Sequence, residues 1–164
     1  MKNNLTEYFK NTVHNFPNKI AIDDNEEIIS FSELDDISNK IANSIISRNT
    51  ISRKPIAVFL PKNRWSVLSY IAIVKAGNFY VPIDIKSPIE RISKILNNLN
   101  PNIIITDLAN LDAIKILGFT GEIILIEEAI NYPLSKDDVL CLQEISQKII
   151  DLDPIYAIYT SGST

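Results

Sequence analysis

The segment from residue 79 to residue 106 most constrains the fold, because it specifies a strand, a helix and a second strand in order. Phe79 to Ile83 is a short apolar run typical of a strand. The tetrapeptide Ser87-Pro88-Ile89-Glu90 then supplies an N-cap serine, a proline at the first helical position and a glutamate at the third. Apolar residues follow at helical spacing, and Asn102 to Thr106 is a β-branched run. This order predicts a parallel strand pair joined by a helix.

The same alternation extends over most of the chain. Lys54 to Leu60 and Glu122 to Ile126 are further apolar runs of strand length. Residues 127–153 carry a weaker pattern, in which Val139 to Ile150 fits either a short helix or a surface excursion. The other predicted elements are helices over Leu5–Phe16, from a Ser32 cap to Ile45, from an Asn63 cap to Gly77 and over Leu108–Leu117, and a hairpin of Lys19–Asp23 with Glu27–Phe31. We therefore expect an α/β fold with a largely parallel sheet and flanking helices.

Composition excludes several classes of function. A formal net charge of -4 with scattered Lys and Arg argues against nucleic acid or an anionic membrane as a partner. No apolar run approaches the roughly 18 residues of a membrane span. With Cys141 as the single cysteine and no apolar leader, the cytoplasm is the expected compartment. His14 is the only histidine, which argues against a metal site built from several histidines and against a Ser-His-Asp triad.

The C-terminal residues carry the candidate binding site. Ile155 to Tyr159 is expected to be a buried strand, and Thr160, Ser161, Gly162, Ser163 and Thr164 follow it directly. Hydroxyl and backbone N–H groups after a strand can bind phosphate oxygens, although such clusters also form plain turns. In parallel sheets, ligands sit outside the carboxyl ends of the strands. No segment matches G-x-x-x-x-G-K-[ST] or G-x-G-x-x-G, which disfavours P-loop kinases and Rossmann dehydrogenases.

Three motifs resemble those of amino-acid adenylation domains of non-ribosomal peptide synthetases, in the adenylate-forming or AMP-binding superfamily. Residues 74–84 and 87–92 (VKAGNFYVPID and SPIERI) resemble that family's LKAGxAYVPID and P-x-E-R-I. Residues 29–34 (ISFSEL) resemble L-[TS]-Y-x-E-L, with Phe31 in place of tyrosine. Residues 156–164 (YAIYTSGST) resemble the opening of Y-x-x-Y-T-S-G-S-T-G-x-P-K-G. The motifs occur in family order, and the resemblance runs from about Leu5 to Thr164.

The resemblance implies that the parent enzyme joins a carboxylate to ATP, giving an acyl-adenylate and pyrophosphate. The acyl group then passes to a carrier-protein thiol. Implied cofactors are ATP and Mg²⁺, with phosphopantetheine on a partner carrier domain. Thr160, Ser161, Gly162, Ser163 and Thr164 are the implied nucleotide-binding residues, because the family's loop grips the pyrophosphate. The chain offers no candidate catalytic residue, since the Gly-x-Pro-Lys-Gly half of the motif would lie beyond Thr164.

The other motif residues have structural interpretations. Lys75 is expected to be a solvated cation at a helix C-terminus, where the dipole favours positive charge. Gly77 is expected to cap that helix, and Glu33 to lie at the start of another. Asp84 is expected to stabilise a turn, and Arg91 to be a surface or packing residue.

We expect residues 1–164 to be an N-terminal fragment of an adenylation domain, incomplete at the C-terminus and inactive alone. Two alternatives stay open. One is another member of the superfamily, such as a D-alanine carrier-protein ligase or an acyl-CoA or aryl-acid ligase. The other is a non-catalytic binding module. The sequence after Thr164 would discriminate between them.

Overall fold

The structure is a computed structural model that describes residues 4–25, 27–48 and 52–160. Within these residues a parallel sheet of four strands has the order β4-β3-β5-β6. The strands are β3 (Pro55–Phe59), β4 (Phe79–Pro82), β5 (Ile103–Thr106) and β6 (Glu122–Leu125). They are joined in turn by the helices α3 (Arg64–Lys75), α4 (Ile89–Leu99) and α5 (Leu111–Ile116). The predicted α/β fold with a parallel sheet is therefore confirmed.

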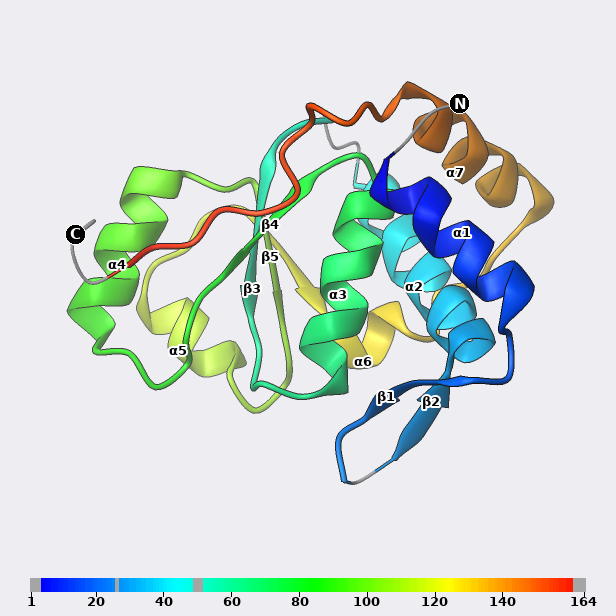
Figure 1. Cartoon of the computed structure of the whole chain (residues 1–164). Helices are drawn as coiled ribbons and strands as arrows, with labels where there is room; N and C mark the ends of the chain where they lie inside the picture. The colour runs from blue at the N-terminus through cyan, green and yellow to red at the C-terminus, as the bar shows by residue number, and fades with distance from the viewer. Residues whose placement is uncertain (1–3, 26, 49–51, 161–164) are drawn as a thin grey trace.

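Helices cover both faces of this sheet, so the molecule has two apolar cores. Side chains alternate along β3: Ile56 and Val58 join the core with α3, while Ala57 and Phe59 join the core with α4 and α5. The first face also carries α2 (Phe31–Ile46) and α6 (Ile126–Ala129). Beyond α2 lie α1 (Leu5–Asn15) and α7 (Lys136–Lys148), while α4 and α5 stand on the other side (Figure 1). None of the described helices is long and apolar enough to cross a bilayer.

The predicted hairpin is confirmed as an antiparallel pair outside the main sheet. It consists of β1 (Ile20–Asp23) and β2 (Ile28–Ser30), and it projects from the body below α2 and α3 (Figure 1). Asp24 in its turn is 3.1 Å from Nη1 of Arg64 at the start of α3. Because both side chains are only 12% exposed, this ion pair fixes the hairpin to the body.

Two helix starts differ from the prediction. The cap of α2 is Ser30, two residues before Ser32: its Oγ accepts from the N–H of Glu33 at 3.3 Å, and Glu33 Oε2 accepts from the N–H of Ser30 at 2.8 Å. Strand β2 therefore runs directly into α2. Helix α4 has Pro88 at its cap position and no side-chain cap, because Ser87 belongs to the preceding turn. The Asn63 cap of α3 is as predicted, with Oδ1 accepting from the N–H of Trp65.

The segment over residues 127–153, left open by the sequence, contains α6 and α7. Of the two options for Val139 to Ile150, the helix is the one observed, and it begins at Lys136 with a Ser135 cap.

The predicted helix over Leu108–Leu117 is observed as the short helix α5, which ends before Gly118. Gly118 has a left-handed φ of 68°.

The prediction that Ile155 to Tyr159 is a buried strand is wrong. This segment makes a single bridge to β4, in which Tyr80 N–H donates to the carbonyl of Ile155 at 3.1 Å and Ala157 N–H donates to the carbonyl of Tyr80 at 3.0 Å. Tyr156 is 56% exposed and Ile158 is 61% exposed. Among the described residues no strand flanks its outer side, so the segment forms the rim of the sheet. It runs from α7 past β4 to α4 (Figure 1).

Candidate functional site

A hollow of about 650 Å³ lies at the carboxyl edge of the sheet. The segments that follow β3 and β4, the first turns of α4 and residues 158–159 surround it. Its lining includes three buried apolar residues. Leu60 belongs to the core with α2 and α3, and Ile83 and Ile95 belong to the core with α4 and α5. This is the edge at which parallel sheets bind ligands, so the hollow is the candidate site.

Tyr159 fixes the point at which the predicted phosphate loop leaves the sheet. Its hydroxyl donates to Oδ1 of Asn98 on α4 at 2.6 Å. Its carbonyl oxygen lies 3.5 Å from Nη2 of Arg91 on the same helix. Thr160 follows and is exposed. The structure therefore brings the start of the loop to the rim of the hollow.

The remaining predicted site residues, Ser161, Gly162, Ser163 and Thr164, lie outside the described residues. Their role in binding phosphate stays a prediction. No group of three or more His, Cys, Asp or Glu side chains is placed to hold a metal ion in the described part of the chain.

The turn after β4 behaves as the sequence predicted. The Asp84 carboxylate Oδ1 accepts from the N–H of Lys86 at 3.0 Å, and the Asp84 carbonyl accepts from the N–H of Ser87 at 3.0 Å. Asp84 therefore holds a turn that places Lys86 and Ser87 on the wall of the hollow.

A stacked tyrosine pair stands beside the hollow. The ring centres of Tyr70 on α3 and Tyr80 on β4 are 4.2 Å apart, and the two ring planes are inclined by 18°. The ring centre of Tyr156 lies 5.8 Å from that of Tyr80. Burial raises the pKa of Tyr70 above its ordinary value of 10, so the phenol, already neutral at pH 7, stays neutral further into the alkaline range. Tyr70 therefore offers an uncharged, half-buried surface to the hollow, which it also lines.

Lys75 is not the solvated cation that its place at a helix end predicted. It is 9% exposed, and its Nζ lies 2.6 Å from Oδ1 of Asp35, 2.7 Å from Oγ of Ser38 and 2.8 Å from Oδ1 of Asn39. The cation also sits 4.9 Å from the ring centre of Phe9. Burial lowers its pKa, and the Asp35 carboxylate opposes that shift.

The reason for this difference is the position of α3. Because α3 is packed against α2, its last turn meets the polar side chains of α2 instead of water. Lys75 therefore joins α2 to α3 and takes no part in the hollow, in agreement with a structural role.

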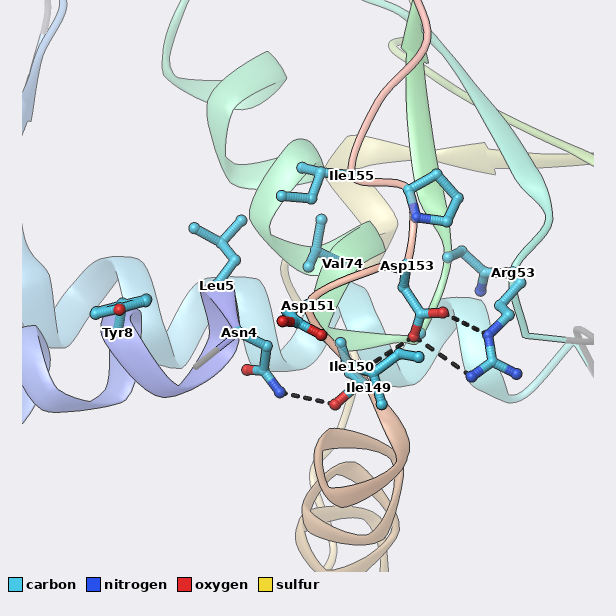
Figure 2. Close-up of a pocket in the computed structure, with 13 residues that line it drawn as sticks. Asn4, Leu5, Tyr8, Arg53, Val74, Ile149, Ile150, Asp151, Asp153 and Ile155 are labelled. Atoms are coloured by element: carbon cyan, nitrogen blue, oxygen red, sulfur yellow. Dashed lines mark hydrogen bonds and ion pairs between the residues drawn. The ribbon is translucent and has the colours of Figure 1, made fainter. Parts of the chain in front are cut away.

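A second, smaller pocket of about 250 Å³ lies at the opposite edge, near the amino ends of β3 and β4 (Figure 2). It is bounded by the start of α1 and by the connection after α7. Asn4 Nδ2 donates to the carbonyl of Ile149 at 2.8 Å, and Arg53 Nε lies 2.6 Å from Oδ1 of Asp153. These contacts join chain segments to one another, and the pocket between them is mostly apolar.

Sequence reasoning missed Lys62, Lys86 and Tyr70, which line the hollow. Their positions did carry a weak signal, since Lys62 follows β3 closely and Lys86 follows β4. Polar residues just after parallel strands share the carboxyl edge of the sheet. They come from separate segments without a common motif, so only the fold shows that they converge.

Comparison with known proteins identifies relatives along nearly the whole chain. The sequence model of the family described as "AMP-binding enzyme" matches residues 9–164. Tyrocidine synthase 1 of Brevibacillus parabrevis is 28% identical over 160 residues, which are 98% of this chain and 14% of that protein. Syringomycin synthase SyrB1 of Pseudomonas syringae pv. syringae is 31% identical over 164 residues, 98% of this chain and 25% of that protein. The chain thus spans a quarter or less of these relatives.

Solved structures share the fold. The non-ribosomal peptide synthetase FmoA3, bound to alpha-methyl-L-serine-AMP, superimposes with a TM-score of 0.80 at 21% identity, over 98% of this chain and 17% of that one. The N-terminal subdomain of Klebsiella oxytoca NpsA, in complex with anthranilyl-AMSN, superimposes with a TM-score of 0.76 at 18% identity, over 100% of this chain and 39% of that one.

Proposed function

Because the chain belongs to the AMP-binding enzyme family, we propose that it forms part of an ATP-dependent amino-acid adenylating ligase of non-ribosomal peptide synthesis. One observation carries this proposal: Tyr159 brings the start of the TSGST loop to the rim of the hollow at the carboxyl edge. A relative named nonribosomal peptide synthetase 5, from Gibberella zeae, supports the same assignment.

In the proposed reaction a carboxylate oxygen of the amino acid attacks the α-phosphorus of ATP. The bond from the α-phosphorus to the bridging oxygen breaks, and pyrophosphate leaves with that electron pair. The leaving group gains negative charge, so fixed N–H and O–H donors near it lower the barrier. We assign this role to Thr160, Ser161, Ser163 and Thr164, with Gly162 allowing close approach of the backbone.

The proposal extends to cofactors and partners. Mg²⁺ would neutralise phosphate charge when bound, and hydroxyl and backbone groups of the kind found in the loop suit a nucleotide phosphate. The acceptor would be the phosphopantetheine thiol of a carrier protein. The amino-acid substrate and the carrier protein would be the partners, and the cytoplasm would be the compartment. The chain by itself is not expected to complete the reaction.

The test is amino-acid-dependent exchange of labelled pyrophosphate into ATP, measured with the natural gene product that contains these 164 residues. We expect exchange with one amino acid or a few similar ones. Ser161→Ala should lower kcat about 10- to 100-fold, because a loop hydroxyl contributes less than a rigid oxyanion-hole donor. Ser135→Ala, at the cap of α7 and outside the lining of the hollow, is the control and should leave kcat unchanged.

Two outcomes would contradict the proposal. Exchange with aryl or fatty acids but no amino acid would favour an acyl-CoA or aryl-acid ligase. The absence of exchange with any carboxylate would favour a non-catalytic module.

A further inference from the structure

Three cations from three separate segments line the hollow at the carboxyl edge. Lys62 lies in the loop after β3, Lys86 in the turn after β4 and Arg91 in the first turn of α4. Lys62 and Lys86 are exposed, and Arg91 is half-buried. The fold therefore collects positive charge around a concave, partly apolar surface.

These cations are not neutralised by neighbouring acids. Within residues 4–25, 27–48 and 52–160, no carboxylate forms an ion pair with Lys62, Lys86 or Arg91. Asp84 also lines the hollow and accepts from the backbone N–H of Lys86, and among the lining residues it is one negative charge against three positive ones. The lining thus carries excess positive charge in a chain whose formal net charge is -4. Such a concave cationic surface attracts and concentrates anions.

Arg91 connects this charge to the predicted loop. Its Nη2 lies 3.5 Å from the carbonyl oxygen of Tyr159, the residue before Thr160. A guanidinium carries five N–H donors, so this long contact leaves most of them available. Their fork geometry suits the paired oxygens of a phosphate group. An anion held by Arg91 would therefore lie close to Tyr159, at the point where the loop begins.

We propose that Lys62, Lys86 and Arg91 form a pyrophosphate-binding site that adjoins Tyr159, where the TSGST loop begins, and receives the leaving group. This inference rests on the proposed function, in which the broken phosphoanhydride bond leaves its electron pair on pyrophosphate. The loop supplies uncharged donors, whereas the three cations supply the compensating charge. A small, multiply charged anion is favoured over a singly charged one because three cations from three separate segments line the same hollow.

The test is a phosphorus NMR titration of pyrophosphate with the 164-residue chain at low ionic strength. We expect saturable binding in the millimolar range that weakens as salt is added. Lys62→Gln, Lys86→Gln and Arg91→Gln together should weaken it about 10- to 100-fold, because each exposed ion pair contributes a factor of roughly two to five. The single variants Lys62→Gln and Lys86→Gln should each weaken it about two- to fivefold. They leave the contact of Arg91 with Tyr159 in place.

The control carries Lys94→Gln, Lys136→Gln and Lys148→Gln, which remove the same charge from exposed positions outside the hollow. It should bind pyrophosphate within about twofold of the wild-type chain, because distant surface charges are largely screened. Circular dichroism of both triple variants checks that they are folded. Inorganic phosphate and sulfate form the comparison arms, and both should bind more weakly than pyrophosphate.

The inference is overturned if pyrophosphate does not bind saturably, or if the hollow and control variants lose the same affinity. It is also overturned if inorganic phosphate binds as tightly as pyrophosphate, since the site would then be a general anion site. Failure of the exchange assay with the natural gene product would instead overturn the proposed function and leave the measured anion site standing. The two failures are therefore distinguishable.

Discussion

At the scale of single residues, Lys75 is the group whose environment matters most for stability. Its ammonium is buried and donates to three side-chain oxygens and one carbonyl oxygen of α2, while the Asp35 side chain remains 29% exposed. We expect Lys75→Met to lower the free energy of unfolding by about 2–4 kcal/mol, because the substitution leaves Asp35 and its polar neighbours without their cation. The partial exposure of Asp35 favours the lower end. Urea denaturation measures the loss, and the exposed Lys94→Met on α4 should change stability by less than about 0.5 kcal/mol. Equal effects of both substitutions would contradict a buried cross-link.

Gly77 and Gly118 form a matched pair of glycines with left-handed backbone. Their φ values are 74° and 68°. A Cβ at Gly77 would lie 3.1 Å from Cγ2 of Ile145, whereas one at Gly118 would meet nothing within 4 Å. Gly118→Ala should therefore cost only the backbone strain, about 1–2 kcal/mol, and Gly77→Ala should cost more. Thermal unfolding of both variants tests the order, and a smaller loss for Gly77→Ala would show that α7 yields at Ile145.

At the scale of elements, α2 begins at a different cap from the one that the sequence predicted: the structure has Ser30, and the prediction was Ser32. Ser30 and Glu33 form a reciprocal capping box, while the hydroxyl of Ser32 only lies 3.2 Å from that of Ser30. Ser30→Ala should destabilise the chain by about 1 kcal/mol, and Ser32→Ala should cost clearly less. Chemical denaturation of the two variants decides between the two serines, and the reverse order would restore Ser32 as the cap.

The elements that sequence could predict are those whose signals are local. The apolar runs of β3 to β6 and the Asn63 cap are encoded within a few residues, and they are observed as expected. The burial of Ile155 to Tyr159 was mispredicted because it depends on strands at both sides, and the described chain provides only β4. The environment of Lys75 was mispredicted for a similar reason, since the side chains of α2 that bind it lie 36–40 positions away.

The candidate site, too, could be predicted from the sequence only in part. The resemblance of residues 156–164 placed the loop start, and the fold puts Tyr159 at the expected edge. Lys62 and Lys86 could not be assigned, because no motif relates two exposed lysines that follow different strands.

The connection after α7 gives a pH-dependent prediction. The Arg53 guanidinium and, less strongly, the N–H of Ile150 lower the pKa of Asp153 from its usual value of 3.8. A carboxylate with a lowered folded-state pKa stabilises the fold above about pH 4, and this stability is lost as the pH falls through the folded-state pKa. Asp153→Asn should therefore be less stable than wild type at pH 7, and the difference should shrink as the pH falls toward 3. Urea midpoints across this range measure it. The control is Asp151→Asn, which removes an exposed neighbouring carboxylate outside the Arg53 pair and should change stability at pH 7 by less than about 0.5 kcal/mol. A gap between Asp153→Asn and wild type that widened in acid would contradict the ion pair.

At the scale of the whole molecule, the sheet is shared by two cores that face opposite sides. Ile104 on β5 belongs to the core with α4 and α5, whereas the next residue, Ile105, belongs to the core with α2 and α3. Both side chains are fully buried. The hollow at the carboxyl edge lies where segments from the two sides meet, so its geometry depends on both cores folding together.

This coupling predicts how damage on one face spreads to the other. Trp65, the only tryptophan, packs against the core with α2 and α3, so its fluorescence reports on that side. Ile104→Ala removes apolar contacts from the opposite core and should cost about 2–4 kcal/mol. Because β5 belongs to both cores, the unfolding midpoint followed by Trp65 fluorescence should fall together with the midpoint followed by far-ultraviolet circular dichroism. Ile105→Ala, on the tryptophan side, should also move both midpoints together. If Ile104→Ala shifted the circular dichroism but left the Trp65 transition at its wild-type midpoint, the two faces would unfold independently, and the shared strand would not couple them.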